Sequence, residues 1–213
     1  MLEAELEAAK LDRAYEGKEK PPLFGIPFCV KDCIQNNGYK TTLGYAHWLE
    51  SREASTDDAY CIEILKFAGA IPFARTNVSQ AMFGYHCANP IFGGTSNPHD
   101  LLRTSGGSSG GVAAMLASRG CLFGMGGDLG GSARIPAAYC GVVGFKPSHF
   151  RASHLGMCEA TPGVQMVFEA PGPMAQTVAT TRQVFQAMAD GQSKRSHPRD
   201  PYMAPVPFQS TIL

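Results

Sequence analysis

The chain has 213 residues, of which 44% are hydrophobic and 17% charged, and its formal net charge is zero. This composition is typical of a globular domain with a buried core, and it excludes a disordered chain. A balanced charge provides no basic surface for nucleic acid, so we expect no nucleic-acid partner.

The start of the chain, "MLEAELEAAK", lacks the basic region and the apolar core of a signal peptide, and no apolar run reaches the length of a membrane span. The seven cysteines are an odd number in a chain without an export signal, so we expect reduced, buried thiols and a cytoplasmic location. Cys29 and Cys33 are four positions apart, but no second pair follows at zinc spacing, so no metal site is expected.

The first part of the chain predicts a helix followed by a strand. Residues 1–20 are rich in Glu, Lys and Ala, which favours an exposed helix that ends before Pro21. The segment "LFGIPFCVKD" (23–32) alternates apolar side chains with the period of a strand and places Lys31 at the end of that strand.

A second helix and strand follow. The segment "STDDAYCIEILKFAGA" (55–70) predicts a helix that is capped by Ser55 or Thr56 and closed by Gly69. The segment "AIPFA" predicts a short strand, and a loop rich in Asn, Gly and Pro follows it from 76 to 104.

The remaining elements complete an alternating pattern. A helix is expected from about Val112, a strand at "CLFGM" (121–125), a buried stretch at 137–145, and a helix at 180–191 that ends at Gly191. Strands that alternate with helices predict an α/β fold, which the family resemblance described below refines to a mixed sheet flanked by helices. We divide the chain into an N-terminal helix (1–20), a main domain (21–190) and a Pro-rich tail or linker (191–213).

Two glycine-rich clusters require an explanation: "SGGSSGG" (105–111) and "GGDLGGSARIP" (126–136). A Walker-type loop needs Lys and then Ser or Thr after its last glycine, but Val112 follows Gly111. The dinucleotide pattern G-x-G-x-x-G fails as well, because Leu129 takes the sixth position counted from Gly124. A simple anion-binding nest at a helix N-terminus stays open.

The pattern of a nucleophile elbow, G-x-S-x-G, occurs twice in the first cluster, centred on Ser108 and on Ser109. Asp128 and then His149 or His154 follow in the chain order of an α/β-hydrolase triad. An elbow needs an apolar strand directly before the serine, whereas the polar, turn-like stretch "NPHDLLRTS" precedes it here. An esterase of this type remains an alternative.

A different constellation explains both clusters together. Ser132 is the nucleophile in this hypothesis, and an oxyanion pocket is lined by successive backbone N–H groups, those of Leu129, Gly130, Gly131 and Ser132. Lys31 is the base if burial holds it neutral, which requires its pKa to fall by ~3 units, or ~4 kcal/mol. Ser108 passes the proton from Ser132 to Lys31.

Three separated segments, "GIPFCVKD" (25–32), "GGSSGG" (106–111) and "GGDLGGSARIPAAYCGVVGFKP" (126–147), together resemble the amidase signature family of serine hydrolases. The resemblance implies a Ser–cis-Ser–Lys triad with Ser132 as nucleophile, Ser108 as the bridging residue in a cis peptide, and Lys31 as base. It also implies hydrolysis of an amide through an acyl-serine intermediate without a metal or organic cofactor. Three further motif positions look like supporting residues: Ser109, Asp128 and Arg134.

Within that family, "TNVSQAMFGYHCANPIFGGTSNP" (76–98) is most similar to the fatty acid amide hydrolase branch. This implies a lipid amide as substrate, with Met82 and Phe83 lining the acyl-chain site; the alternative is that both side chains pack in the core. The amidotransferase subunit that supplies ammonia for tRNA charging usually has an acidic "EFAMG" segment here, where this chain reads "SQAMFGYHC".

The resemblance covers residues 21 to about 207 and implies the N-terminal half of a longer catalytic domain. Membrane association would then depend on parts of such enzymes that this chain does not span, and the oligomeric state stays open. Gly127 and Ala133 depart from the larger residues common in the family, which predicts looser packing around the nucleophile. A non-catalytic fragment of an amidase is the further alternative.

Overall fold

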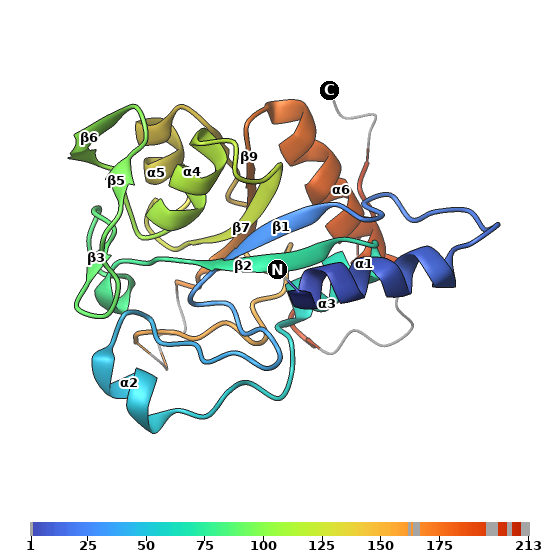
Figure 1. Ribbon diagram of the computed structural model, residues 1–213, viewed down its shortest axis with the longest axis horizontal. Coiled ribbons are helices and arrows are strands. Elements are labelled where there is room, and N and C mark those ends of the chain that lie inside the picture. Colours follow the sequence, from blue (N-terminus) through green and yellow to red (C-terminus); the bar gives the residue numbers. More distant parts are fainter. Residues whose placement is uncertain (1, 162, 164–166, 195–199, 204–205, 210–213) are drawn as a thin grey trace.

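The structure is a computed structural model, and it describes residues 2–161, 163, 167–194, 200–203 and 206–209. A five-stranded mixed sheet forms its centre (Figure 1). The strands are, in spatial order, β2 (Ile71–Thr76), β1 (Pro27–Lys31), β7 (Phe123–Asp128), β9 (Ala170–Ala175) and β8 (Val143–Gly144). β2, β1 and β7 run parallel, whereas β9 is antiparallel to both of its neighbours. The expected fold class, a mixed sheet flanked by helices, is therefore confirmed.

One face of the sheet packs against α3 (Tyr60–Phe67) and α6 (Val178–Lys194). Phe28 and Val30 of β1 and Phe123 and Met125 of β7 point into this part of the core. The rings of Phe28 and Phe123 are stacked with their centroids 5.0 Å apart. This face buries most of the large apolar side chains of the chain.

The opposite face is covered by α4 (Gly110–Ala117) and α5 (Arg134–Cys140), and it carries the smaller residues of the sheet. Cys29 packs there against Val112, and Gly124 allows that approach because a Cβ at this position would lie 2.5 Å from the Cys29 sulfur. Side chains alternate along a strand, so Lys31 lies on the same face as Cys29. With both faces covered, Lys31 is fully buried.

The other elements surround this sandwich (Figure 1). Helix α1 (Leu2–Ala14) lies against β2 and buries none of its side chains, and α2 (Ala46–Ser51) is a short helix. The loop after β2 holds the 3-10 turn η1 (Gln80–Met82). It also holds two small hairpins, formed by β3 (Ala88–Asn89) with β4 (Gly93–Gly94) and by β5 (Ser96–Asn97) with β6 (Asp100–Thr104).

The elements differ from the expected ones mainly at their ends. The first helix stops at Ala14 rather than at residue 20, and the last one continues through Gly191 to Lys194. Gly191 packs closely on α3, since a Cβ there would lie 2.8 Å from Ile64. It therefore serves helix packing rather than termination. The division of the chain at residues 20 and 190 stays a prediction.

The predicted cap of α3 is wrong. The helix begins at Tyr60 after Ala59, and no side chain caps it. Asp58 is used instead to hold the preceding loop, because its carboxylate accepts hydrogen bonds from the side chain of Asn36 at 2.7 Å and from Lys66 at 2.5 Å. Gly69 does follow the helix with a φ of +89°, as expected for a residue that closes a helix.

All seven cysteines are free and buried, in line with the expectation of reduced thiols. In the part of the chain that the structure describes, no helix combines the length and the apolar character needed to cross a membrane.

Candidate active site

The two glycine-rich clusters meet beside the end of β7. The backbone N–H of Ser109, the residue before α4, donates a hydrogen bond to the carbonyl of Ser132 at 2.9 Å. The Ser109 hydroxyl donates to the carbonyl of Gly127 at 3.2 Å. Gly126 permits this contact, because a Cβ there would lie 3.1 Å from the Ser109 Oγ. The Gly107–Ser108 peptide is cis, which is the isomer that the resemblance implies.

Asp128 holds the loop that carries Ser132. Its side chain is fully buried and accepts backbone hydrogen bonds from Gly131 at 2.7 Å, Ala133 at 3.1 Å and Arg134 at 3.2 Å. The Arg134 guanidinium adds two more bonds, each of 2.9 Å. Burial by itself raises the pKa of this carboxyl, but Arg134 and the three N–H groups outweigh it and lower the pKa to about 2. These bonds are what a residue that supports the loop would make, and the supporting roles of Asp128 and Arg134 stay a prediction.

Lys31 reaches the same loop from the end of β1. Its Nζ donates to the carbonyl of Gly127 at 3.2 Å, so this one carbonyl accepts bonds from both Lys31 and Ser109. A second bond of 2.9 Å joins the Nζ to the carboxylate of Glu169. Lys31, the first glycine-rich cluster and the second one are thus linked through Gly127, although 77 positions separate Lys31 from Ser108 in the sequence.

The charge state of Lys31 differs from the expected one. Burial lowers the pKa of its ammonium, while electrostatic interactions with Cys33 and with Glu169 raise it, and the net direction is upward. The resting arrangement thus favours a charged Lys31, because the Glu169 carboxylate stabilises the ammonium, and the neutral base that the hypothesis requires forms only when this ammonium loses a proton.

The expected proton relay is not formed by direct hydrogen bonds in this structure. The Ser108 hydroxyl is buried and has no hydrogen-bond partner among the described residues. The bonds of Lys31 go to Gly127 and Glu169 instead. The roles of Lys31, Ser108 and Ser132 as base, bridge and nucleophile accordingly stay a prediction, carried by their shared location.

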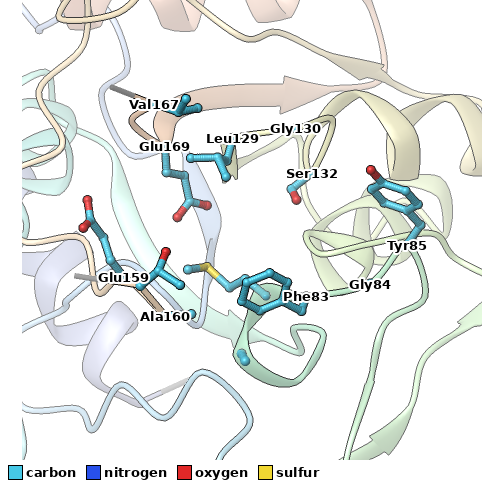
Figure 2. A pocket seen from close by; sticks show the side chains of 13 residues that line it. Phe83, Gly84, Tyr85, Leu129, Gly130, Ser132, Glu159, Ala160, Val167 and Glu169 are labelled. Carbon is cyan, nitrogen blue, oxygen red and sulfur yellow. The ribbon is translucent and has the colours of Figure 1, made fainter. Parts of the chain in front are cut away.

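Ser132 opens onto a pocket of about 260 Å³. Figure 2 shows its hydroxyl at one side of the cavity, with Phe83 and Leu129 on neighbouring walls and two glutamates, Glu159 and Glu169, further along. Most of the lining is apolar, with Met82 and Val167 contributing as well.

The turn η1 brings Met82 and Phe83 to this pocket. Ala81 and Met82 both have positive φ angles, 58° and 59°, a conformation that side chains of L-residues rarely adopt and that is often found at ligand sites. Met82 packs against the core and lines the pocket at the same time. Phe83 is 69% exposed, so the alternative that it packs in the core is wrong.

The oxyanion donors expected from the second cluster are only partly available. The N–H of Gly131 is occupied by Asp128, so it does not face a substrate in this arrangement. Gly130 lines the pocket, and a Cβ built on it would meet nothing within 4 Å, which leaves its backbone accessible. The N–H groups of Leu129, Gly130 and Ser132 remain predicted donors.

The alternative of a nucleophile elbow finds no support. Strand β6, the strand before Ser108, belongs to a small hairpin and not to the central sheet. His149 and His154 lie among aromatic rings, each next to Phe168. Among the described residues, no hydrogen bond joins either histidine to Ser108 or Ser109.

The described part of the chain also holds no group of three or more His, Cys, Asp or Glu side chains that is arranged to hold a metal ion.

Sequence reasoning missed Glu169. This residue lies directly before β9, which was not predicted either, and its contact with Lys31 spans 138 positions. The only sequence signal is a glutamate at the start of an apolar run, "EAPGPMA" (169–175), which by itself indicates no site.

The mixed α/β fold carries two glycine-rich loops that are linked to a buried lysine through the carbonyl of Gly127. A family model described as Amidase matches residues 1–211, and the chain belongs to this family, with the signature segments quoted above. The predicted family resemblance is confirmed.

Individual relatives fall in more than one branch. The chain is 40% identical over 214 aligned residues to fatty acid amide hydrolase 1 of Caenorhabditis elegans, an alignment that covers 100% of this chain and 37% of that relative. It is 41% identical over 183 residues to a glutamyl-tRNA(Gln) amidotransferase subunit of Prochlorococcus marinus, covering 85% of this chain and 36% of that relative. A solved structure of a fatty acid amide hydrolase matches with a TM-score of 0.85 and 31% identity, covering 95% of this chain and 36% of that one. The chain therefore spans less than half the length of these relatives.

Proposed function

We propose that this chain supplies the catalytic centre of a serine amidase that hydrolyses fatty acid amides. The observation that carries the proposal is the apolar pocket that opens onto Ser132, beside a loop that is tied to Lys31 through Gly127. Similarity to a protein named fatty acid amide hydrolase 1 supports the choice of substrate, and the similar identity to an amidotransferase subunit makes that choice a matter for experiment.

The proposed reaction begins with attack of the Ser132 oxygen on the amide carbonyl. The proton of Ser132 passes to Ser108, which gives its own proton to a neutral Lys31. The developing oxyanion accepts hydrogen bonds from the backbone N–H groups of the loop that follows Asp128. As the carbon–nitrogen bond breaks, the proton returns by the same route to the leaving amine. Water then cleaves the acyl-serine ester in the same two steps.

The mostly apolar lining of the pocket fits an acyl chain better than a polar side group. Met82, Phe83, Leu129 and Val167 offer apolar surface around the predicted nucleophile. Each methylene of an acyl chain that moves from water onto such surface contributes about 0.8 kcal/mol. A long-chain amide therefore gains binding energy that acetamide lacks.

Turnover of three amides tests the proposal: a long-chain primary fatty amide, acetamide and glutamine, each with the purified chain and with Ser132→Ala and Lys31→Ala. We expect hydrolysis of the long-chain amide to exceed that of the other two and to disappear in both variants. Equal turnover of acetamide or glutamine would overturn the fatty-acid assignment. No turnover of any amide by a chain with a folded circular-dichroism spectrum would overturn the proposal and favour a non-catalytic fragment.

A further inference from the structure

A buried carboxylate occupies the position next to the predicted general base. Glu169 is 6% exposed, and its Oε1 accepts a hydrogen bond of 2.9 Å from the Nζ of Lys31, which is fully buried. The other oxygen, Oε2, is buried as well and has no hydrogen-bond partner among the described residues. Figure 2 shows this carboxylate pointing into the pocket on whose wall Ser132 lies.

Gly127 provides the space for this carboxylate. A Cβ at position 127 would lie 2.0 Å from the Glu169 Oε1 and 2.7 Å from its Cδ, so any side chain there would displace Glu169 from Lys31. The sequence alone predicts that glycine at this position loosens the packing around the nucleophile. The structure corrects this expectation, because the space beside Gly127 is filled by the Glu169 carboxylate.

The neutral thiols around Lys31 do not compete with Glu169. Burial raises the pKa of Cys33 well above its ordinary value, and burial also raises the pKa of Cys87. Both thiols are therefore uncharged near neutral pH. Cys33 raises the pKa of Lys31 only where the thiol is itself ionised, so Glu169 is the group that carries a negative charge next to Lys31 at neutral pH.

The other carboxylates near Lys31 have their own cationic partners. Asp128 is bonded to Arg134, and Asp32, the residue after Lys31, is bonded to Arg75 at 2.5 Å. Glu169 is thus the carboxylate that is left to balance the buried ammonium.

We propose that Glu169 is a positioning residue for the general base: it holds Lys31 as a charged ammonium that is bonded to Gly127 and Glu169, and it thereby sets the pH at which Lys31 can accept the proton of Ser132. This inference rests on the proposed role of Lys31. The resting ammonium must lose a proton to solvent before Lys31 can accept the proton of Ser132 through Ser108. A carboxylate 2.9 Å away opposes the first of these steps.

The test compares the wild-type chain with Glu169→Gln, which keeps the size and the acceptor oxygen but removes the charge. Gly127→Ala is the second variant, because it displaces the carboxylate without changing it. Asp100→Asn is the control, because this exposed carboxylate is paired with Arg103, lies outside the pocket and has no bond to Lys31 among the described residues.

Two readouts are used. The first is the titration midpoint of Lys31, followed by NMR of the ¹³Cε-labelled lysine and assigned by its loss in Lys31→Met. The second is the pH dependence of the rate at which a fluorophosphonate labels Ser132. We expect Glu169→Gln and Gly127→Ala to lower both midpoints by about 1 to 3 pH units, and Asp100→Asn to leave them in place. At neutral pH, labelling of Glu169→Gln should be about 10-fold faster or more, since each unit changes the neutral fraction tenfold.

An unchanged NMR midpoint in a folded Glu169→Gln chain would overturn the inference, whether or not Ser132 is labelled. A lowered NMR midpoint without any labelling of Ser132 at any pH would support the effect of Glu169 on Lys31 and overturn the proposed function instead. Lowered midpoints with faster labelling would support both.

Discussion

Replacement of Asp128 by Asn should destabilise the chain through loss of charge rather than loss of shape. Asp128 is fully buried and receives five hydrogen bonds from Gly131, Ala133 and Arg134. The difference between its ordinary pKa of 3.8 and its value of about 2 in the folded chain corresponds to roughly 2 kcal/mol, at 1.36 kcal/mol per unit. We therefore expect Asp128→Asn to lose about 2 kcal/mol of unfolding free energy at pH 7.

The sign of the pH dependence follows from the direction of the shift. A carboxyl with a lowered pKa in the folded state contributes its full stabilisation above the unfolded pKa, near 4, and loses it as the pH falls through about 2. The difference between wild type and Asp128→Asn should accordingly shrink between pH 4 and pH 2.

Urea unfolding followed by circular dichroism over this pH range measures the effect. Asp100→Asn is the control, since its ion pair with Arg103 is exposed on a hairpin and should contribute less than about 1 kcal/mol. A difference between wild type and Asp128→Asn that is as large at pH 2 as at pH 7 would refute the electrostatic explanation and point to packing.

Three further changes test the packing and the pocket. Gly124→Ala should cost about 1–3 kcal/mol of unfolding free energy, because the new Cβ would lie 2.5 Å from the Cys29 sulfur. Gly130→Ala is the control in the same urea titration: its Cβ would meet nothing within 4 Å, so the unfolding free energy should change by less than about 0.5 kcal/mol. Phe83→Ala should slow the labelling of Ser132 by a long-chain fluorophosphonate about 10-fold while sparing a short-chain one, and equal slowing of both would argue against an acyl-chain site. Ser109→Ala should cost about 1 kcal/mol in unfolding free energy, since it leaves the Gly127 carbonyl without one of its two donors; an unchanged stability would show that this bond is replaced.

Local patterns in the sequence predict those parts of the fold that depend on periodicity. The alternation along 23–32 places Lys31 at the end of a strand, and β1 does end there. Gly69 is expected to close a helix, and it follows α3 with a positive φ. These features are local because the residues that decide them lie within a few positions of each other in the chain.

Strand β9 escapes such reasoning. Pro171 and Pro173 argue against a strand inside a sheet, since proline has no N–H to donate. The register pairs them with Gly127 and Met125 of β7, and the carbonyl of Pro173 still accepts a bond from the N–H of Phe145. The strand is thus stabilised by contacts with segments that are distant in the chain, and these contacts cannot be predicted from its own sequence.

The interactions of the candidate site also fall into two groups, those between residues close in the chain and those between distant segments. Asp128 and Arg134 are six positions apart within one motif, so their ion pair can be expected from the sequence. The pairing of Lys31 with Glu169 joins the end of β1 to the residue before β9, and β7 separates these two strands in the sheet. This pairing reverses the expected direction of the pKa shift at the predicted base. The charge state of a buried residue can therefore be predicted only when its neighbours in space are known, whereas a motif can be recognised from the sequence alone.

The central claim, that Ser132 is a nucleophile activated by Lys31, is tested most directly by the intact mass of the chain after treatment with a serine-directed fluorophosphonate, followed by mapping of the modified peptide. We expect one label on Ser132, and we expect it to be lost in Lys31→Ala. A label on Ser108 or Ser109, or no label on a chain with a folded circular-dichroism spectrum, would contradict it.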